Sequence, residues 1–270
     1  MWYNLHVKGN DDTPLQKGKK NMKICIFDTE TTSLDKPFCY NIGYIITDSD
    51  TGEILISREF VVEQVWHNLP LFESAYYANK RQFYVQAMRA KTIKMDKFGY
   101  ICAQMRRDFK QFEVDCAFAY NSSFDEKVFN FNCDWFKCIN PFDEIPIKDI
   151  RGFVHHFIVN KDYLKFCDDN GYYTETGNYS TTAETVYRYI AKNNDFIEAH
   201  TALNDAEIEM EILFACVDNG AYLNGDYTAF RSIKRNVEKE LHIRTAEQTD
   251  YYFNYTTIRI NKGKTEIILI

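Results

Sequence analysis

The sequence predicts an α/β protein with a mixed five-stranded sheet flanked by helices, followed by a small C-terminal appendage. Short apolar runs typical of buried strands occur between residues 23 and 148, and segments with helical spacing separate the later runs from one another. Hydrophobic residues make up 45% and charged residues 26% of the 270-residue chain, which is the usual balance of a folded domain that buries its own core.

Five segments have the apolar pattern of strands. The first is a nearly continuous apolar run, which suits a strand buried on both faces. A turn-rich stretch at 48–52 joins the second and third, so we expect an antiparallel hairpin and an antiparallel arrangement of the first three strands. The predicted strands are Lys23–Phe27, Tyr40–Thr47, Glu53–Val62, Cys116–Tyr120 and Ile145–Lys148.

The remaining segments have mainly helical spacing, and in 63–113 this spacing is broken only at Pro70. Helices are predicted at Phe98–Phe112, at Phe124–Trp135, from Asp149 onward, and around 161–168, 181–191 and 202–217. We divide the chain into a polar N-terminal arm at 1–21, a catalytic domain at 22–217 and an appendage at 218–270. The appendage is expected to hold an amphipathic helix at Phe230–Leu241 and a hairpin of Thr256–Ile260 with Thr265–Ile270.

Charge and composition exclude several classes of protein. The 32 Lys and Arg residues against 39 Asp and Glu give a net charge of −7, which argues against binding nucleic acid through bulk positive charge. The net charge does not exclude an enzyme that binds phosphates through bound cations. No apolar stretch approaches the length of a membrane helix and no secretory signal is visible, so we expect a cytoplasmic protein without a membrane partner.

The eight cysteines are scattered and none forms a CxxC pair. Cys133 and Cys138 are five apart, with no second matching pair and no histidine at ligand spacing. The spacing therefore predicts reduced, mostly buried thiols and no zinc site.

Carboxylates follow the first and fourth predicted strands. Asp28 and Glu30 lie in FDTETT, Asp125 lies in AYNSSFD, and Asp205 lies at the entry to the last long helix. Ligand sites in such sheets gather outside the carboxyl ends of strands, so we expect these acids to face one point. Four converging carboxylates without basic partners would repel one another, and hard cations such as Mg²⁺ or Mn²⁺ remove that conflict.

His200 precedes Asp205 by five residues, on the approach to the helix. An unperturbed histidine pKa of about 6.5 suits a general base at neutral pH. The alternative is that His200 is a surface residue or caps the helix. Asp149 also follows a strand, a position where a carboxylate is more often a helix cap than a ligand.

Together, FDTETT at 27–32, AYNSSFD at 119–125 and HTALNDA at 200–206 resemble the three motifs of the DEDDh 3′–5′ exonucleases. The likeness covers roughly 22–217 and is to the proofreading epsilon-subunit type, which has a ribonuclease H-like fold. It implies a hydrolase that releases nucleoside 5′-monophosphates from a 3′ end with two divalent ions. By position, Asp28, Glu30, Asp125 and Asp205 would bind metal, and His200 would be the general base.

The resemblance also implies substrate-binding roles for Thr31, Asn121 and Phe124. The alternative roles are structural, with Asn121 bonding its loop and Phe124 in the core. One departure is Ser33, where the family usually has glycine.

Single-stranded DNA with a free 3′ end is the favoured substrate, and a polymerase or another replication protein is the expected partner. RNA is the alternative substrate. A less favoured function is a non-catalytic module that binds nucleic acid or protein, and HTALNDA argues against a ribonuclease H-type endonuclease. The aromatic stretch 72–84 fits either a core face or a surface that stacks on unpaired bases.

Overall fold

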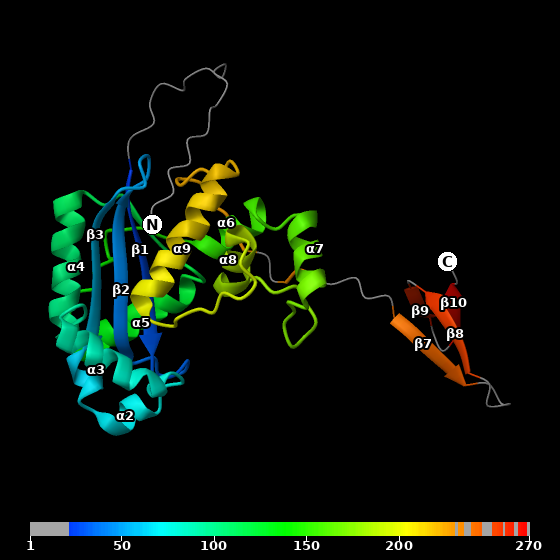
Figure 1. Cartoon of the computed structure of the whole chain (residues 1–270), viewed down its shortest axis with the longest axis horizontal. Helices are drawn as coiled ribbons and strands as arrows, with labels where there is room; N and C mark the ends of the chain where they lie inside the picture. The colour runs from blue at the N-terminus through cyan, green and yellow to red at the C-terminus, as the bar shows by residue number, and fades with distance from the viewer. Residues whose placement is uncertain are drawn as a thin grey trace, which may run out of the picture. The chain divides into compact units, whose positions relative to one another are not determined.

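Figure 1 shows the computed structural model of the chain, which describes residues 22–229, 232–234, 239–244, 250–255, 257–261 and 264–268. These residues fall into two units, one within 1–158 and 182–229 and the other within 159–181 and 230–270. Every residue of the candidate site belongs to the first unit. The predicted N-terminal arm lies outside the described residues, and the domain boundaries stay predictions.

A six-stranded mixed sheet forms the centre of the first unit, in the order β4-β3-β2-β1-β5-β6. Strand β2 runs antiparallel to β1 and β3, whereas β4, β5 and β6 pair in parallel with their neighbours. The strands are β1 (Lys23–Thr31), β2 (Cys39–Asp48), β3 (Ile54–Val62), β4 (Lys94–Asp96), β5 (Cys116–Ala119) and β6 (Ile147–Asp149). The predicted α/β fold, with a mixed sheet and antiparallel first strands, is confirmed.

The predicted number of five strands is wrong by one, because β4 lies within 63–113, where mainly helical spacing was expected. It pairs in parallel with the last residues of β3, from Phe60 to Val62. Its three residues, KMD, are too few and too polar to produce an alternating pattern. Pairing with a sheet edge that is already formed makes this segment a strand.

The helices match the predicted segments closely, and Phe98–Phe112 is reproduced in full. In Figure 1 the long helix α9 crosses the front of the strands. The first unit contains α1 (Glu63–Trp66), α2 (Leu69–Glu73), the 3₁₀ helix η1 (Ala78–Lys80), α3 (Arg81–Ala90), α4 (Phe98–Phe112), α5 (Ser123–Phe136), α6 (Ile150–Phe157), α8 (Ala183–Ala191) and α9 (Ala202–Asp218). Helix α7 (Lys161–Asn170) belongs to the second unit. None of the described helices is long and apolar enough to cross a membrane.

Alternate residues of β1 face different helices. Phe27 is fully buried and packs on Phe129 of α5, with ring centroids 5.8 Å apart. Asp28, the next residue, points to the other face, where it lies opposite Gly43 of β2. One strand therefore contributes both to the apolar core and to a polar cluster under α9.

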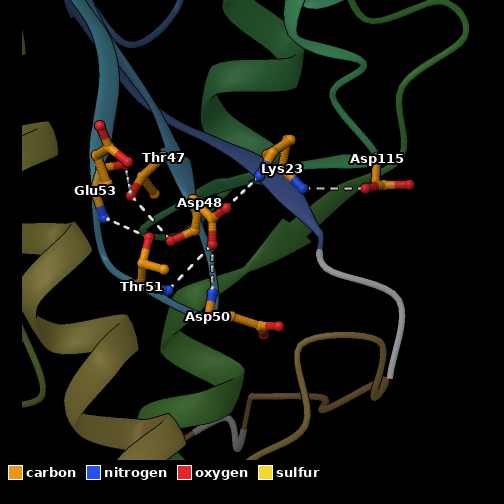
Figure 2. A network of polar contacts seen from close by, with 7 residues as sticks. All are labelled: Lys23, Thr47, Asp48, Asp50, Thr51, Glu53 and Asp115. Carbon is orange, nitrogen blue, oxygen red and sulfur yellow. Dashed lines mark hydrogen bonds and ion pairs between the residues drawn. The ribbon is translucent and has the colours of Figure 1, made fainter. Parts of the chain in front are cut away.

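A polar network fixes the opposite end of the same strands (Figure 2). The Asp48 carboxylate accepts hydrogen bonds from the backbone amides of Asp50 and Thr51, at 2.9 and 3.1 Å, and pairs with the Lys23 ammonium. The Lys23 backbone amide donates to Asp115 Oδ2 at 3.1 Å. These contacts tie the start of β1 to the turn after β2 and to the entry of β5. They hold the central strands in register, away from the candidate site.

The predicted C-terminal helix at Phe230–Leu241 is wrong where the structure describes it. Its last three residues lie in β7 (Lys239–Arg244), which pairs antiparallel with β8 (Asp250–Tyr255). The sequence KELHIR alternates apolar and polar residues at its end, which fits a strand once a partner strand is present.

The predicted C-terminal hairpin is confirmed. Strand β9 (Thr257–Asn261) pairs antiparallel with β10 (Lys264–Ile268).

Candidate active site

The carboxyl-terminal half of β1 carries two acids on one face. Asp28 lies opposite Gly43 of β2, and Glu30 lies opposite Asn41, so both acids share the side on which α9 packs. The Glu30 side chain is largely enclosed, since the residue is only 9% exposed. The predicted common orientation of Asp28 and Glu30 follows from this register.

Two residues of β2 bring α9 against these acids. A Cβ atom at Gly43 would lie 2.2 Å from the backbone nitrogen of Leu203, so only glycine lets the helix approach this closely. Asn41 Oδ1 accepts a hydrogen bond of 2.8 Å from the backbone amide of Ala202. Together they fix the first turn of α9 directly over β2. Neither residue was predicted to take part in the site.

This docking brings three predicted residues together. Glu30, His200 and Asp205 each offer a ligand atom, and these atoms lie within 4.8 Å of one another. Asp205 is 5% exposed, and its Oδ1 is buried with no hydrogen-bond partner. A buried carboxylate oxygen without a donor is unfavourable by itself and fits a site for a cation.

Asp125 approaches from the other face of β1. It lies in the first turn of α5, is 3% exposed, and accepts a 2.6 Å hydrogen bond from Thr29 Oγ1 to its Oδ1. After burial, the charge of Asp125 is the strongest influence that raises the pKa of Asp28. The charge of Asp125 therefore acts on Asp28 across β1.

Burial is the main cause of the raised pKa values of the acids. The pKa of Glu30 rises to about 9, that of Asp205 to about 8 and that of Asp125 to about 7. The charge of Asp205 adds to the effect at Glu30. Carboxyls in this state hold protons near neutral pH unless a cation replaces them. Because the ligand atoms of the four acids are all oxygens, a hard divalent ion such as Mg²⁺ or Mn²⁺ fits these carboxylates best.

The expectation that these acids have no basic partner is wrong. Lys80, from η1, lies close enough to lower the pKa of both Glu30 and Asp205 against the larger effect of burial. Its Nζ also donates a 3.3 Å hydrogen bond to the backbone oxygen of His200. Lys80 lies 39 residues before the nearest motif, AYNSSFD at 119–125, so local spacing could not have identified it.

His200 is held by several contacts. Its backbone is left-handed, with φ of 48°, and its ring stacks on Tyr77 with centroids 4.3 Å apart at 16°. Its Nδ1 lies 3.7 Å from Glu198 Oε2, within ion-pair distance. Burial, and then the charge of Lys80, lower the pKa of the imidazole. The ring is therefore fixed on one side by Tyr77 and at Nδ1 by Glu198.

Sequence reasoning also missed Glu209 and Glu198. Glu209 lies one helical turn after Asp205, is 4% exposed, and accepts a 3.1 Å hydrogen bond from the backbone amide of Tyr120. Burial raises its pKa well above the ordinary range. The four-residue spacing from Asp205 could have indicated Glu209. No pattern in the sequence singles out Glu198.

The structure gives the other predicted residues, Thr31, Asn121 and Phe124, contacts outside the group of Glu30, His200 and Asp205. The Thr31 hydroxyl donates to the backbone oxygen of Ser33 at 3.3 Å. Asn121 is exposed and left-handed, with φ of 61°, and its backbone amide donates to Asp149. Phe124 packs against the apolar core, which is the structural role expected as its alternative.

Asp149 is a helix cap, as its position favoured. Its Oδ1 accepts hydrogen bonds from the backbone amides of Asn121, at 2.8 Å, and Arg151, at 3.0 Å. The turn that leads into α5 is therefore tied to the start of α6.

Comparisons with known proteins give a likeness of fold at low identity. No family model and no curated protein matches the sequence. Among solved structures, Escherichia coli exonuclease I with a dA16 oligonucleotide matches at 18% identity and a TM-score of 0.45, over 71% of this chain and 40% of that one. The same enzyme with a 5cy-dT13 oligonucleotide matches at 14% identity and a TM-score of 0.49, over 74% of this chain and 41% of that one. A product-bound exonuclease I matches at 17% identity and a TM-score of 0.46, over 73% of this chain and 43% of that one. The chain thus spans about two fifths of these proteins, and its activity has to be inferred from the site.

Proposed function

We propose that this protein is a metal-dependent 3′–5′ exonuclease of the DEDDh type, with single-stranded DNA as its favoured substrate. The observation that carries the proposal is the convergence of Glu30, Asp205 and His200 within 4.8 Å, at the strand end that also bears Asp28. Asp125 completes the acidic set from the opposite face of β1. The three motifs that resemble the family contribute all five residues.

Asp28, Glu30, Asp125 and Asp205 would hold two Mg²⁺ or Mn²⁺ ions. The unpartnered Oδ1 of Asp205 and the raised pKa values of Glu30 and Asp125 support this assignment. Burial raises these pKa values, and the charge of Lys80 near Glu30 does not offset it, so bound cations would stabilise the ionised carboxylates. Bound divalent ions supply charge that stabilises the phosphate in the transition state.

His200 would act as the general base. It takes a proton from the attacking water, whose oxygen bonds to phosphorus while the bond from phosphorus to the preceding 3′ oxygen breaks. The products are a nucleoside 5′-monophosphate and a chain with a new 3′ hydroxyl. Glu198, beside Nδ1, and Tyr77, stacked on the ring, would orient Nε2 toward the water. The lowered pKa of His200 keeps the imidazole neutral, as a base requires.

A degradation assay tests this function. The full chain is incubated with 5′-labelled single- and double-stranded DNA and RNA, with Mg²⁺, with Mn²⁺ and with excess chelator. We expect stepwise shortening of single-stranded DNA from its 3′ end, release of mononucleotides and no activity in chelator. Cleavage of a closed single-stranded circle, or full activity in chelator, would overturn the proposal.

The alternative substrate and function are outcomes of the same assay. Preferential shortening of RNA would identify an exoribonuclease. Binding without degradation, in the presence of both metals, would indicate a non-catalytic module. A polymerase or another replication protein as partner stays a prediction.

A further inference from the structure

Three thiols meet between α4 and α5, outside the candidate active site. Cys102 lies on α4, Cys133 lies on α5, and Cys138 follows the end of α5. Their sulfur atoms all lie within 4.8 Å of one another. Cys102 and Cys133 are buried, whereas Cys138 is partly exposed and opens the cluster to solvent.

The end of α5 places Cys138 beside Cys133. Lys137 adopts a left-handed conformation, with φ of 55°, and reverses the chain. The backbone amide of Cys138 then donates a 3.0 Å hydrogen bond to the backbone oxygen of Cys133. This helix cap brings Cys138 back beside Cys133.

Helix α4 is shaped to receive this turn. Gly99 and Cys102 are three residues apart and share a helix face. A Cβ atom at Gly99 would lie only 3.3 Å from the Cβ of Cys138, so the absence of a side chain there lets the turn pack closely. Arg106 on the same helix donates a 2.8 Å hydrogen bond to the backbone oxygen of Ile139, next to Cys138. A guanidinium at this position favours thiolates.

We propose that Cys102, Cys133 and Cys138 bind one zinc ion through three thiolates, with a solvent ligand on the exposed side. Sulfurs about 2.3 Å from a common zinc in tetrahedral geometry lie about 3.8 Å apart, so three sulfurs that all lie within 4.8 Å of one another are close enough to share one ion. Thiolates select zinc over Mg²⁺, and this site is therefore distinct in chemistry from the carboxylate site. The expectation of no zinc site rested on spacing in the sequence, which could not reveal the third thiol.

The zinc ion would link α4 to α5. Both helices pack against the same apolar core, through residues such as Phe98 and Phe129, whose ring centroids are 5.9 Å apart. The site shares no residue with the proposed exonuclease centre, so its test does not depend on catalysis.

Metal titration of the reduced, metal-free full chain tests the site. Cd²⁺, which binds thiolates and gives an ultraviolet charge-transfer band with them, is the spectroscopic probe. We expect the band to saturate at one equivalent, to disappear when Zn²⁺ is added, and to resist a large excess of Mg²⁺. Competition with a chromophoric chelator then gives the zinc affinity and stoichiometry.

Single substitutions locate the site. Cys138→Ser, at the partly exposed position, removes one of the three thiolates, so it is expected to lower the absorbance of the one-equivalent band and to weaken zinc binding by more than about 100-fold. Cys216→Ala, on α9 and outside the cluster, is the matched control and should keep both the charge-transfer band and the zinc affinity of the parent. Zn²⁺ should raise the melting temperature of the parent and of the control, but not that of Cys138→Ser.

Two outcomes would overturn the proposal. One is a parent protein whose thiols are confirmed as reduced but which gives no charge-transfer band at one equivalent. The other is an unchanged band in a folded Cys138→Ser variant. If Cys102→Ser or Cys133→Ser fails to fold, the folded Cys138→Ser variant still tests whether these thiols bind the metal.

Discussion

Single carboxylates of the site should matter far more for turnover than for folding. Asp205→Asn removes a charge whose Oδ1 has no hydrogen-bond partner, so we expect degradation to fall by several orders of magnitude while the fold persists. Asp134→Asn, at an exposed position on α5, is the control and should retain parental activity. Steady-state degradation with saturating Mg²⁺, together with circular dichroism, checks both variants.

An Asp205→Asn variant that degrades DNA at the parental rate would contradict the assignment of this residue to the metal site. So would a control that loses activity to the same extent, because the effect would then not be specific to the cluster.

His200 should determine the acidic limb of the pH–rate profile. A general base acts in its neutral form, so turnover rises with pH as the imidazole loses its proton. Because burial and the charge of Lys80 lower the pKa of His200, this rise should lie below the ordinary value of about 6.5. His200→Ala should lower kcat by about 10²–10⁴-fold and remove this ionisation, with Mn²⁺ binding by calorimetry little changed.

Lys80→Met separates this electrostatic effect from catalysis itself. Loss of the positive charge should move the acidic limb of the profile to higher pH. Lys110→Met, at an exposed position on α4, is the matched control. A limb that moves to lower pH in Lys80→Met, or a parental profile in His200→Ala, would show that the base is another group.

The contact between β2 and α9 is the element on which the geometry of the site depends. Gly43→Ala places a methyl group within 2.5 Å of the Ala202 oxygen and still closer to other backbone atoms, so the helix has to move. We expect a loss of about 1–3 kcal/mol of stability, together with a loss of activity beyond what partial unfolding explains. Unfolding by denaturant measures the loss of stability. The kcat, measured at denaturant concentrations below the unfolding transition, measures the loss of activity.

Gly52→Ala is the comparison for this change. Unlike Gly43, Gly52 has a left-handed backbone, with φ of 70°, and a Cβ atom there meets nothing within 4 Å. This substitution should affect stability through the backbone and leave kcat unchanged. If Gly43→Ala keeps full activity, close docking of α9 is not needed to assemble the site.

At the scale of the whole molecule, the buried acids link stability to pH and to metal. The pKa values of Glu30 and Asp205 are raised in the folded state, to about 9 and about 8, so the folded metal-free protein binds more protons than the unfolded chain above about pH 4. Its stability is therefore greatest at low pH within this window and falls as pH rises toward those values. A pKa that differs by one between the folded and unfolded states changes the free energy of unfolding by about 1.4 kcal/mol, which is readily measurable.

Mg²⁺ should reverse this trend, because it replaces the protons and binds only the folded state. The melting temperature should rise more with Mg²⁺ at pH 8.5 than at pH 5.5, and matched ionic strength with NaCl is the control. Asp205→Asn should reduce both the pH dependence and the response to Mg²⁺. A melting temperature that is insensitive to pH and to Mg²⁺ would contradict the description of this cluster as a cation site.

The sequence by itself determined the order of the elements and the candidate chemistry. Periodicity predicted the central strands and α4 because each contains enough apolar residues to show its period. The three motifs identified Asp28, Asp125 and His200 as candidate site residues. Periodicity did not reveal β4, whose three residues become a strand only beside β3.

Only the tertiary structure decided which residues meet at the site. Lys80 and Tyr77 reach His200 from a segment far away in the sequence, and Gly43 becomes important only because α9 crosses it. The three thiols likewise come together only when α4 packs on α5. Local spacing records which residues share a face of one element, whereas contacts between distant segments depend on how the elements pack.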